Sequence, residues 1–335
     1  MTETTSTIAV DLGRTGCRAA LWRNGAAEPV ATAAGDGTLG LTGPDGAAAA
    51  GKAILAVVAP LLAEQKLAHV DAVGIGAPGV LIAPTAAREL AEHLRQTLQA
   101  QTVALASDAV TSHAGALGGA PGVVLAAGTG AVVVAIGPDR QFHRVDGWGP
   151  WFGDDGSGAW LGLAGLRAAA HAHDGRGPAT RLCEAAWQQF GSPEALALKL
   201  SMEDNPARIA AAFVPAIVRA AEHADLVAVD LILAASTALA QSTLAGAAAL
   251  KDVTPVPVAI VGGLTELGAI LLDPLHATLA RSALPLQVRA ARGTSLDGAR
   301  RLATDGGIHE PWVVRAGTFP ASARQRPPHT AMESR

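Results

Sequence analysis

Five short segments carry residue types that could bind a phosphate, a metal ion or a sugar, and four of them contain glycine. The first covers residues 11–16, Asp-Leu-Gly-Arg-Thr-Gly, at the end of an apolar run. A turn with two glycines can point backbone N–H groups toward an anion, and the Thr15 hydroxyl adds a donor. A carboxylate at Asp11 could hold a hydrated Mg²⁺, which takes few protein carboxylates and keeps several waters. The alternative is a plain hairpin turn, and the motif by itself does not separate the two.

A second glycine turn, Gly128-Thr129-Gly130, lies between two strongly apolar runs. It could face a phosphate for the same reason, or it could be another plain hairpin. Two such turns, one opening each half of the chain, arise by accident less readily than one. Turns that hold a polyphosphate from two sides would suit phosphoryl transfer, in which positioning and charge stabilisation supply most of the catalysis.

The pair Ser107-Asp108 follows an apolar run over residues 102–106 and precedes a helix predicted over residues 109–117. The carboxyl end of a strand is where α/β sheets place groups that contact ligands. A carboxylate there could accept the proton of an attacking hydroxyl. Ser and Asp are also preferred helix N-caps, and position alone favours that simpler interpretation.

Residues 147–158 hold five glycines, three aromatic side chains and two carboxylates, in a chain that has only six Trp, five Phe and no Tyr. Core packing would account for Trp151 and Phe152. It accounts less well for the glycines and for Asp154 and Asp155. A sugar pocket explains both, because apolar walls with a few polar groups are typical of ligand sites.

The fifth segment covers residues 261–268, where the apolar run 257–261 leads into Gly262-Gly263 and then a predicted helix. Missing side chains would let a flat group approach the backbone, and a helix start favours anions. A tight strand-to-helix turn is the alternative, and the signal is weak by itself.

The elements that must position these segments alternate between short apolar runs and longer helical stretches, which predicts an α/β fold. The predicted strands are residues 7–12, 17–22, 29–33, 70–75, 102–106, 123–127, 131–136, 141–145, 257–261 and 286–290. The predicted helices are residues 48–62, 86–99, 109–117, 158–171, 180–190, 207–222, 226–250, 265–281 and 295–302. Each half of the chain opens with a strand, a Gly/Thr turn and a returning strand.

A chain of 335 residues exceeds the size at which one hydrophobic core stops growing, so two lobes are expected. We predict an N-terminal lobe over residues 1–107 and a C-terminal lobe with helical insertions over 108–308. Residues 309–335 have little apolar content and are predicted to be a disordered tail. The apolar stretch 226–250 contains Asp230 and several hydroxyl side chains, which favours a buried core helix over a membrane span.

The composition disfavours several classes of function. The net charge is −4 without a basic stripe, which argues against nucleic-acid binding. Cys17 and Cys183 are distant in the sequence and form no CxxC pair, so a structural zinc site is not expected. Two distant cysteines in a chain of this size indicate a reducing, cytoplasmic setting. The ten histidines show no metal-ligand spacing. The N-terminus lacks the pattern of a signal peptide, and no membrane partner is expected.

Taken in order, these segments resemble the N-acetylglucosamine kinase branch of the BadF/BadG/BcrA/BcrD ATPase family, in the actin/hexokinase/Hsp70-like superfamily. The similar stretches are DLGRTGCRAALW, SDAVTSHAGAL, LAAGTGAVVVAIG, DGWGPWFGDDGSGAWLG and VAIVGGLTELG. They span about residues 7–304. Leu12, Ala131 and Asp155 depart from the residues common in the family, and they bear on the sugar more than on the kinase chemistry.

The resemblance implies two actin-like (ribonuclease H-like) lobes with a nucleotide cleft between them, and phosphorylation of an amino sugar at its 6-hydroxyl with ATP and Mg²⁺. It implies Asp108 as the catalytic base, Asp11 near the metal ion, and a homodimer as one assembly state. The implied nucleotide contacts are Gly13, Arg14, Thr15, Gly128, Thr129, Gly130, Gly262 and Gly263. The implied sugar contacts are Asp36, Thr129, Trp148, Gly149, Asp154 and Ser157.

Three questions stay open at this point. The sugar could be N-acetylglucosamine, which we rank first, or glucosamine, N-acetylmuramic acid or glucose. An activator-type ATPase would need cysteines that ligate an iron–sulfur cluster, and neither Cys17 nor Cys183 stands in such a context. A non-catalytic sugar sensor would be expected to add a DNA-binding segment, and none precedes residue 7.

Overall fold

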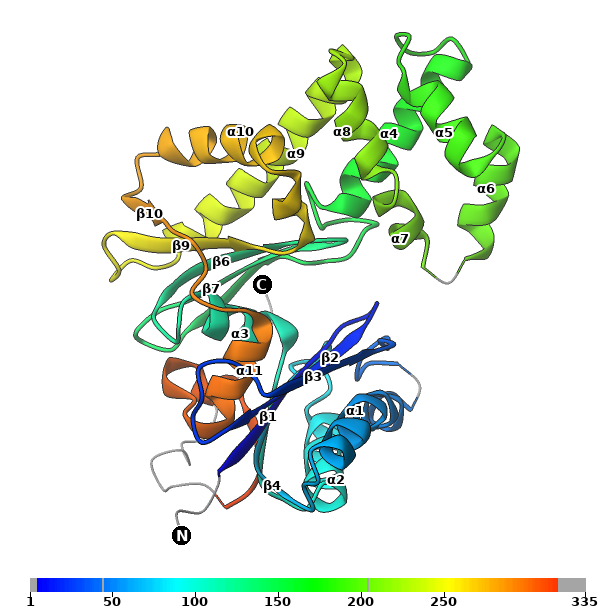
Figure 1. Ribbon diagram of the computed structural model, residues 1–335. Coiled ribbons are helices and arrows are strands. Elements are labelled where there is room, and N and C mark those ends of the chain that lie inside the picture. Colours follow the sequence, from blue (N-terminus) through cyan, green and yellow to red (C-terminus); the bar gives the residue numbers. More distant parts are fainter. Residues whose placement is uncertain (1–4, 44, 204, 319–335) are drawn as a thin grey trace. The chain divides into compact units, whose positions relative to one another are not determined.

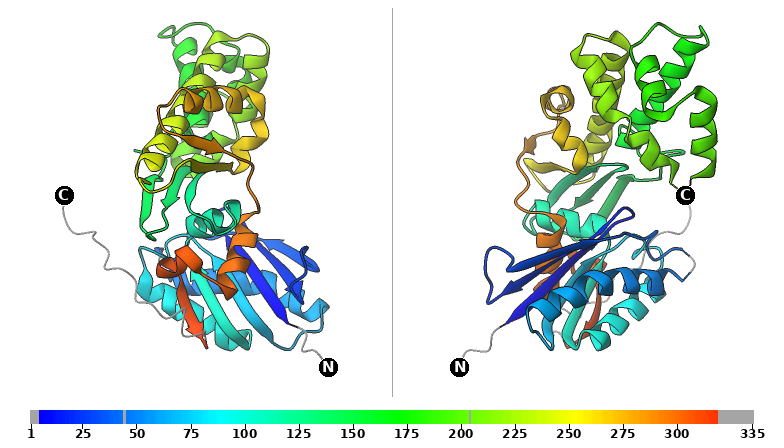
Figure 2. Two further views of the ribbon diagram at one scale, coloured as in Figure 1. Left: turned by 90° about the vertical axis from the view of Figure 1, so that its left-hand side faces the viewer. Right: turned by 45° about the vertical axis from the view of Figure 1, so that its right-hand side comes forward.

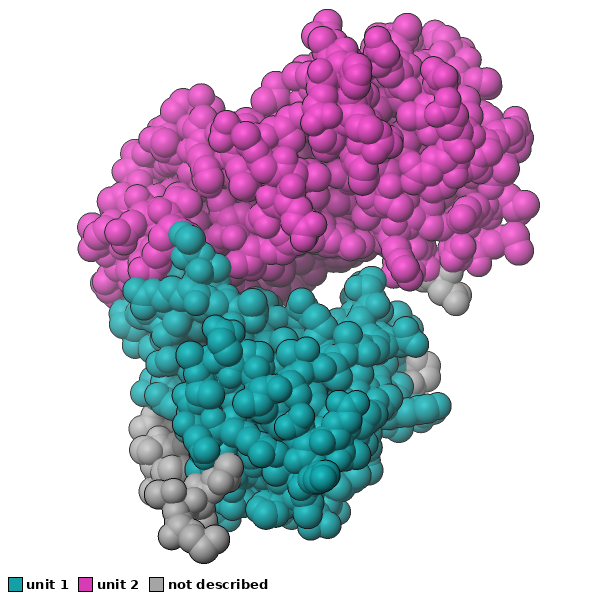
Figure 3. Space-filling model, in the orientation of Figure 1, with its two compact units in different colours: residues 1–121, 136–141, 290–335 teal, residues 122–135, 142–289 magenta. Residues whose placement is uncertain are grey.

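The chain folds into two compact units, which Figure 3 shows in different colours. Each unit is built on one β-sheet. The structure is a computed structural model that describes residues 5–43, 45–203 and 205–318. Unit 1 takes its residues from 1–121, 136–141 and 290–335, and unit 2 from 122–135 and 142–289.

Unit 1 contains a six-stranded sheet in the order β11-β5-β4-β1-β2-β3. Helices α1 and α2 pack on one face of it, and α3 and α11 on the other (Figure 1). The strands are β1 (Ser6–Leu12), β2 (Cys17–Arg23), β3 (Ala31–Gly35), β4 (Val70–Gly76), β5 (Ala100–Ala106) and β11 (Val314–Gly317). The helices are α1 (Gly46–Glu64), α2 (Pro84–Thr97), α3 (Asp108–Ala116), α11 (Ser295–Thr304) and the 3₁₀ turn η2 (Gly307–Trp312).

Unit 2 contains a five-stranded sheet in the order β10-β9-β6-β7-β8, with its helices gathered on one side (Figure 1). The strands are β6 (Gly122–Ala127), β7 (Ala131–Ile136), β8 (Phe142–Asp146), β9 (Val256–Val261) and β10 (Leu286–Val288). The helices are α4 (Gly158–His173), α5 (Leu182–Phe190), α6 (Pro193–Met202), α7 (Pro206–Ala211), α8 (Val214–Glu222), α9 (Leu226–Ala248), α10 (Ala269–Ala280) and the 3₁₀ turn η1 (Gly263–Leu267).

The two sheets repeat the same strand order. Without the edge strand β11, unit 1 reads β5-β4-β1-β2-β3 and unit 2 reads β10-β9-β6-β7-β8. In both, a hairpin is extended by two strands that run parallel to its first strand. The predicted likeness of the two halves is therefore correct, and it holds at the level of strand order.

Helices α3 and α11 fall within the predicted C-terminal lobe, but they pack on the sheet of unit 1, where they lie side by side (Figures 1 and 2). Their backbones approach so closely that a Cβ on Gly115 would lie 1.9 Å from the Thr294 carbonyl oxygen. A Cβ on Gly298 would lie 1.8 Å from the Thr111 carbonyl oxygen. Contact between glycine backbones leaves no apolar pattern in the sequence. Nothing in the sequence therefore indicates that α3 packs with the first sheet, and the predicted boundary at residue 107 separates the two.

Part of the predicted tail is ordered. Strand β11 pairs antiparallel with β5, and His309 is buried, with its Nε2 2.9 Å from the Nδ1 of His113. Glu310 and Arg315 form an ion pair that is almost fully buried. The prediction of disorder is thus wrong for residues 309–318, because few apolar side chains are needed when a strand edge and a buried ion pair hold the segment. Residues 319–335 lie outside the described part of the chain.

Among the residues that the structure describes, two helices, α1 and α9, are long and apolar enough to cross a membrane by length and composition alone. Both contribute one face to the core of their own unit, α1 through residues such as Ile54 and α9 through Ile232 and Leu239. The opposite face of α9 is exposed, so α9 packs into the core through one face only.

The helix predicted over residues 207–222 is divided at Ala212 into α7 and α8. Helix α6 was not predicted.

We predict that Gly298→Ala destabilises unit 1 by about 1–3 kcal/mol, because the new methyl group meets a backbone carbonyl that cannot rotate aside. The matched control is Gly51→Ala in α1, where the nearest atom to a Cβ is a Leu90 methyl at 3.4 Å. The control should gain about 0.5–1 kcal/mol from helix propensity. Urea unfolding measures both, and equal midpoints for the two variants would contradict the packing argument.

Candidate active site

The parallel strands of unit 1 bring two carboxylates to one edge of its sheet. Asp11 in β1 pairs with Gly76 in β4, and Gly76 pairs with Ala106 in β5. Asp108 follows β5 by two residues and begins α3. The carboxyl ends of adjacent parallel strands are a common place for ligand contacts, and the sequence prediction for these two residues is consistent with that position.

Asp108 is not the cap of α3, because Ser107 takes that position and accepts a hydrogen bond from Val110 N at 3.2 Å. The Asp108 carboxyl accepts one hydrogen bond, from Ala109 N at 2.9 Å, and is half-buried. Burial raises the pKa of this carboxyl and the nearby Asp11 raises it further, while the Ala109 N–H and Arg14 act in the opposite direction. A carboxyl that is not needed as a cap and has a raised pKa is a candidate general base.

Asp11 has a surrounding that fits a cation ligand. Its Oδ2 accepts hydrogen bonds from Arg18 at 2.5 Å and from Ser295 Oγ, at the start of α11, at 2.7 Å. Its Oδ1 has no such partner among the described residues, and the side chain stays partly exposed. One carboxylate with a free oxygen suits Mg²⁺, which binds proteins through one or two carboxylates and takes its other oxygens from water and phosphate.

The turn after β1 is closed by a hydrogen bond from Gly13 N to Gly16 O at 2.8 Å, and Arg14 and Thr15 at its tip are exposed. Gly37 lies directly against this turn, where a Cβ would approach the Gly13 carbonyl oxygen to 2.3 Å. Only glycine fits there, so the loop that carries Asp36 is fastened to the turn. Gly37 is not among the predicted site residues, and its place two residues after β3 is the one signal in the sequence that indicates it.

In unit 2 the turn Gly128-Thr129-Gly130 joins β6 to β7 and is tied to the start of α4. Gly158 N donates to the Gly128 carbonyl at 2.8 Å, and Ala159 N donates to the Thr129 carbonyl at 2.9 Å. These bonds use two carbonyl groups of the turn, and a third bond, from Gly128 N to the Gly130 carbonyl at 2.8 Å, closes the turn itself. A Cβ on Gly130 would lie 2.6 Å from Asp154 Oδ2.

Residues 147–158 form a loop organised by a carboxylate that the sequence analysis did not select. Asp146, at the end of β8, accepts hydrogen bonds from Asp154 N and Asp155 N, both at 2.7 Å. Asp154 in turn accepts from Gly149 N at 3.0 Å. Asp146 and Asp154 both have positive φ angles, of 62° and 56°. The carboxylates thus hold strained backbone in place. An Asp at a strand end just before Gly-Trp-Gly was the available clue to Asp146.

Trp148 and Ser157, both predicted as sugar contacts, have different surroundings. The Trp148 ring is 55% exposed, with the Arg144 guanidinium 4.1 Å from its centroid. Ser157 is fully buried, and its hydroxyl caps α4 by accepting from Trp160 N at 3.2 Å. We therefore assign Ser157 to helix capping and remove it from the sugar contacts, because a buried cap cannot face a ligand.

Gly262 brings the turn after β9 onto the end of β6. Its φ of 104° is open only to glycine, and a Cβ there would lie 2.3 Å from the Ala127 carbonyl oxygen. It therefore lies next to Gly128, in the same unit. A Cβ on Gly263 or on Gly128 would meet no atom within 4 Å, so the backbone is open to approach at both positions. This fits a flat group that packs against the backbone.

The predicted residues thus fall into two groups. Unit 1 holds Asp11, Gly13, Arg14, Thr15, Asp36 and Asp108, and unit 2 holds Gly128, Thr129, Gly130, Trp148, Gly149, Asp154, Gly262 and Gly263. Cys17 is buried and its pKa is raised to about 11 by burial and by Asp11, which disfavours the thiolate that a cluster would need. No group of three or more His, Cys, Asp or Glu side chains gathers at a metal-binding distance in the described ranges.

Comparison with known sequences gives a family and one partial relative. The model of the BadF/BadG/BcrA/BcrD ATPase family matches residues 8–277. An N-acetylmuramic acid/N-acetylglucosamine kinase from Clostridium acetobutylicum is 31% identical over 80 residues, which are 24% of this chain and 26% of that protein. The chain thus matches about a quarter of the length of that curated relative.

Comparison with solved structures extends over most of the chain. A candidate N-acetylglucosamine kinase from Chromobacterium violaceum has a TM-score of 0.69 at 29% identity, covering 89% of this chain and 99% of that one. Another, from Porphyromonas gingivalis, has a TM-score of 0.68 at 17% identity over 88% and 98%. A ROK family glucokinase from Streptomyces griseus, in complex with glucose and AMPPNP, has a TM-score of 0.57 at 22% identity over 89% and 99%. The predicted actin-like α/β fold is confirmed.

We predict that Asp146→Ala loosens the 147–158 loop, because two backbone N–H groups lose their acceptor at a cost of about 1–3 kcal/mol. Hydrogen exchange at residues 147–156 should become faster while exchange in β6 and β7 stays unchanged. Asp139→Ala is the control, since Asp139 is exposed and accepts a single bond, from Gln141 N. Unchanged exchange in the Asp146 variant would show that other contacts order the loop.

Proposed function

We propose that this chain, which belongs to the BadF/BadG/BcrA/BcrD ATPase family, is a kinase that transfers the γ-phosphoryl group of ATP to an amino sugar. N-acetylglucosamine is the proposed substrate and its 6-hydroxyl the proposed acceptor. The relative from Clostridium acetobutylicum and the two candidate N-acetylglucosamine kinases support an amino sugar over glucose. The cytoplasm, where ATP is available, is the proposed compartment.

The observation that carries the proposal is the Asp108 carboxyl. It stands at the carboxyl edge of the sheet next to Asp11 and Arg14, and Ser107 caps the helix in its place. A carboxylate freed from capping can accept a proton at its second oxygen from a hydroxyl within hydrogen-bond reach. A non-catalytic sensor would have no need for it.

In unit 1, different residues would contact the sugar hydroxyl, the phosphate oxygens and the metal ion. Asp108 orients the sugar hydroxyl and takes its proton as the new P–O bond forms. Arg14 and Thr15, exposed on the turn after β1, would bind phosphate oxygens, and Asp11 would hold Mg²⁺ through its free oxygen. Bound ATP with Mg²⁺ supplies the phosphoryl group and neutralises the charge on the leaving oxygens.

The residues of unit 2 would hold the remaining parts of the two substrates. In the turn Gly128-Thr129-Gly130, the N–H groups of Thr129 and Gly130 and the Thr129 hydroxyl suit a phosphate or a sugar hydroxyl, and the backbone at Gly128 is open to its approach. Gly263 leaves the backbone open to a purine ring or ribose, and Gly262 lets this turn pack against the end of β6. An exposed Trp148 face can stack on the C–H groups of a sugar, next to Gly149, and the Asp154 carboxylate can accept from its hydroxyls.

We expect Asp108→Asn to lower turnover about 10²–10⁴-fold, the range for loss of a general base, while nucleotide binding persists. ADP release with Mg·ATP measures turnover, and a fluorescent nucleotide analogue measures binding. Asp252→Asn, which neutralises an exposed carboxylate in unit 2, is the control. Turnover within a factor of three of the unmodified chain would remove Asp108 from the mechanism.

The substrate is tested with a panel of N-acetylglucosamine, glucosamine, N-acetylmuramic acid and glucose, each scored by ADP release. We expect kcat/KM to be highest for N-acetylglucosamine, and the product to carry phosphate on the 6-oxygen by NMR. A preference for glucose would reject the amino sugar and keep the kinase. ADP release that no sugar stimulates would reject the kinase.

The pH profile tests the electrostatics of Asp108. Since Arg14 lowers the pKa of Asp108, Arg14→Gln should raise it. Asp108 acts as a base only when it is ionised, so the acid limb of log kcat/KM against pH should move to higher pH. This shift is expected even if the plateau value of kcat/KM falls. Arg14→Lys keeps the charge and should leave the limb in place. An acid limb that is unchanged in Arg14→Gln would mean that another group produces it.

A further inference from the structure

The Asp11 carboxylate in unit 1 receives two side-chain hydrogen bonds, and the two donors differ in how firmly they are held. Ser295 Oγ donates to Asp11 Oδ2 at 2.7 Å, and Arg18 donates to the same oxygen at 2.5 Å. Ser295 is the first residue of α11 and lies 284 positions from Asp11 in the sequence. Arg18 is the cross-strand neighbour of Asp11 on β2, and its side chain is 62% exposed. One oxygen thus has a fixed donor and a displaceable donor.

The Ser295 hydroxyl is not needed by the helix that carries it. Thr294 is the N-cap of α11 and forms a capping box with Asp297, in which the side chain of each residue accepts a hydrogen bond from the backbone N–H of the other. The Ser295 hydroxyl has no part in this cap and donates to Asp11. A capping box fixes the start of a helix, so the donor reaches Asp11 from a rigid element.

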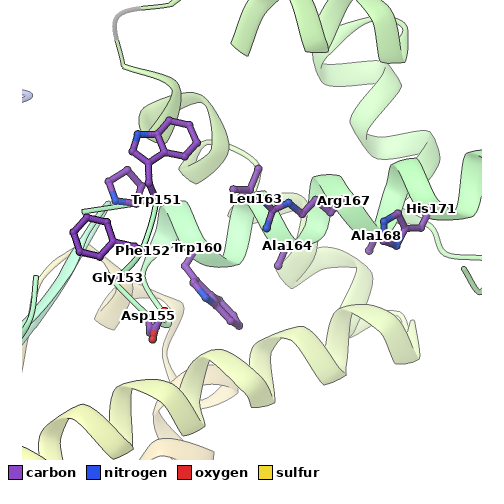
Figure 4. Close-up of a pocket in the computed structure, with 11 residues that line it drawn as sticks. Trp151, Phe152, Gly153, Asp155, Trp160, Leu163, Ala164, Arg167, Ala168 and His171 are labelled. Atoms are coloured by element: carbon purple, nitrogen blue, oxygen red, sulfur yellow. The ribbon is translucent and has the colours of Figure 1, made fainter. Parts of the chain in front are cut away.

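A carboxylate in unit 2 shows the contrast with Asp11. Asp155 lines the pocket beside α4, where its side chain points away from the Trp151 ring (Figure 4). Its carboxylate accepts no hydrogen bond from a side chain in the described ranges. A carboxylate of this kind can rotate, and ordering it when a ligand binds costs conformational entropy. Asp11 is ordered in advance by its donors, which is the condition for a preorganised ligand of a metal ion.

We propose that Ser295 is a positioning residue for Asp11, and that Arg18 is a counter-charge that Mg²⁺ displaces. The inference rests on the proposed function, in which Asp11 holds the metal ion. Ser295 keeps Oδ2 in its hydrogen bond and so leaves Oδ1 for the cation. Groups that hydrogen-bond to a metal-ligating carboxylate fix its orientation and increase the affinity for the metal. Arg18 acts in the opposite direction, because its positive charge repels a cation that approaches Asp11.

The two donors are therefore expected to have opposite effects on metal binding. Loss of a group that orients a metal ligand lowers metal affinity about 10–100-fold. Loss of an exposed paired charge has a smaller effect, about two- to fivefold, and at Arg18 the effect is a gain in metal affinity. Damage to the fold would weaken metal binding in both variants. Opposite signs for Ser295 and Arg18 therefore separate positioning from a purely structural role.

A fluorescent ADP analogue measures these effects without turnover. Its dissociation constant for the full chain is determined in EDTA and in excess Mg²⁺, and we call the ratio of the first to the second the metal factor. We expect Ser295→Ala to lower the metal factor about tenfold, while Ser295→Thr, which keeps the hydroxyl, retains it. The constant of Ser295→Ala in EDTA should change less than about twofold, since no contact with the nucleotide is removed. Arg18→Gln should raise the metal factor about two- to fivefold.

Two matched controls come from unit 1. Thr304→Ala removes a hydroxyl from the other end of α11, and Arg88→Gln removes an exposed charge from α2, so both should leave the metal factor unchanged. An unchanged metal factor in Ser295→Ala, or a metal factor of one in the unmodified chain, overturns the role of Ser295. A metal factor that falls in Arg18→Gln overturns the role of Arg18. Absence of analogue binding under both conditions overturns the proposed function together with this inference.

Discussion

The hydrogen bond from Ser295 to Asp11 depends on backbone contacts at three glycines, where a side chain would not fit. Where α3 crosses α11, Gly115 and Gly298 remove the two Cβ atoms that would separate the helices, and each backbone touches a carbonyl of the other. Gly74 does the same between β4 and α11, where a Cβ would lie 1.8 Å from the Ala299 carbonyl oxygen. The start of α11 is thereby held against β1, so that Ser295 reaches Asp11. A wider spacing would separate Ser295 from the carboxylate that it supports.

The two units share a strand order but fix their candidate site residues by different means. In unit 1 the edge of a parallel sheet and the glycine contacts do so, and Asp11 and Asp108 project from regular elements. In unit 2 a loop does so, through carboxylates that accept from backbone N–H groups. Residues Asp146 and Asp154, held at positive φ, cost about 1–2 kcal/mol each, and their hydrogen bonds offset that cost. Site residues on a loop therefore need a polar network to fix their positions. A single substitution in that network is expected to disturb them more than a substitution near the strand ends of unit 1 disturbs Asp11 and Asp108.

What the sequence could reveal follows from how local each feature is. The hairpin β1–β2, the turn at Gly128 and the strand before Asp108 were predictable, because apolar runs ended by glycine are local patterns. The ordered part of the C-terminal segment was not, since it depends on the His113–His309 contact across 196 residues and on pairing with β5. The membership of α3 and α11 in unit 1 was hidden for the same reason. In the loop 147–158, the residue types indicated a site, while the role of Asp146 and the burial of Ser157 appeared only in three dimensions.

The pKa of Asp108 depends on the charges of Asp11 and Arg14, and therefore on any charged ligand that binds to either of them. Burial and Asp11 raise the pKa of Asp108, and Arg14 opposes them. A positive charge that binds at Asp11 cancels one of the raising influences, and so acts on Asp108 in the same direction as Arg14. Negative phosphate oxygens that pair with Arg14 remove its lowering influence and act the other way. The two effects offset each other only when cation and phosphate arrive together. The pKa of Asp108 should therefore move less when cation and phosphate are both bound than when either one is bound alone.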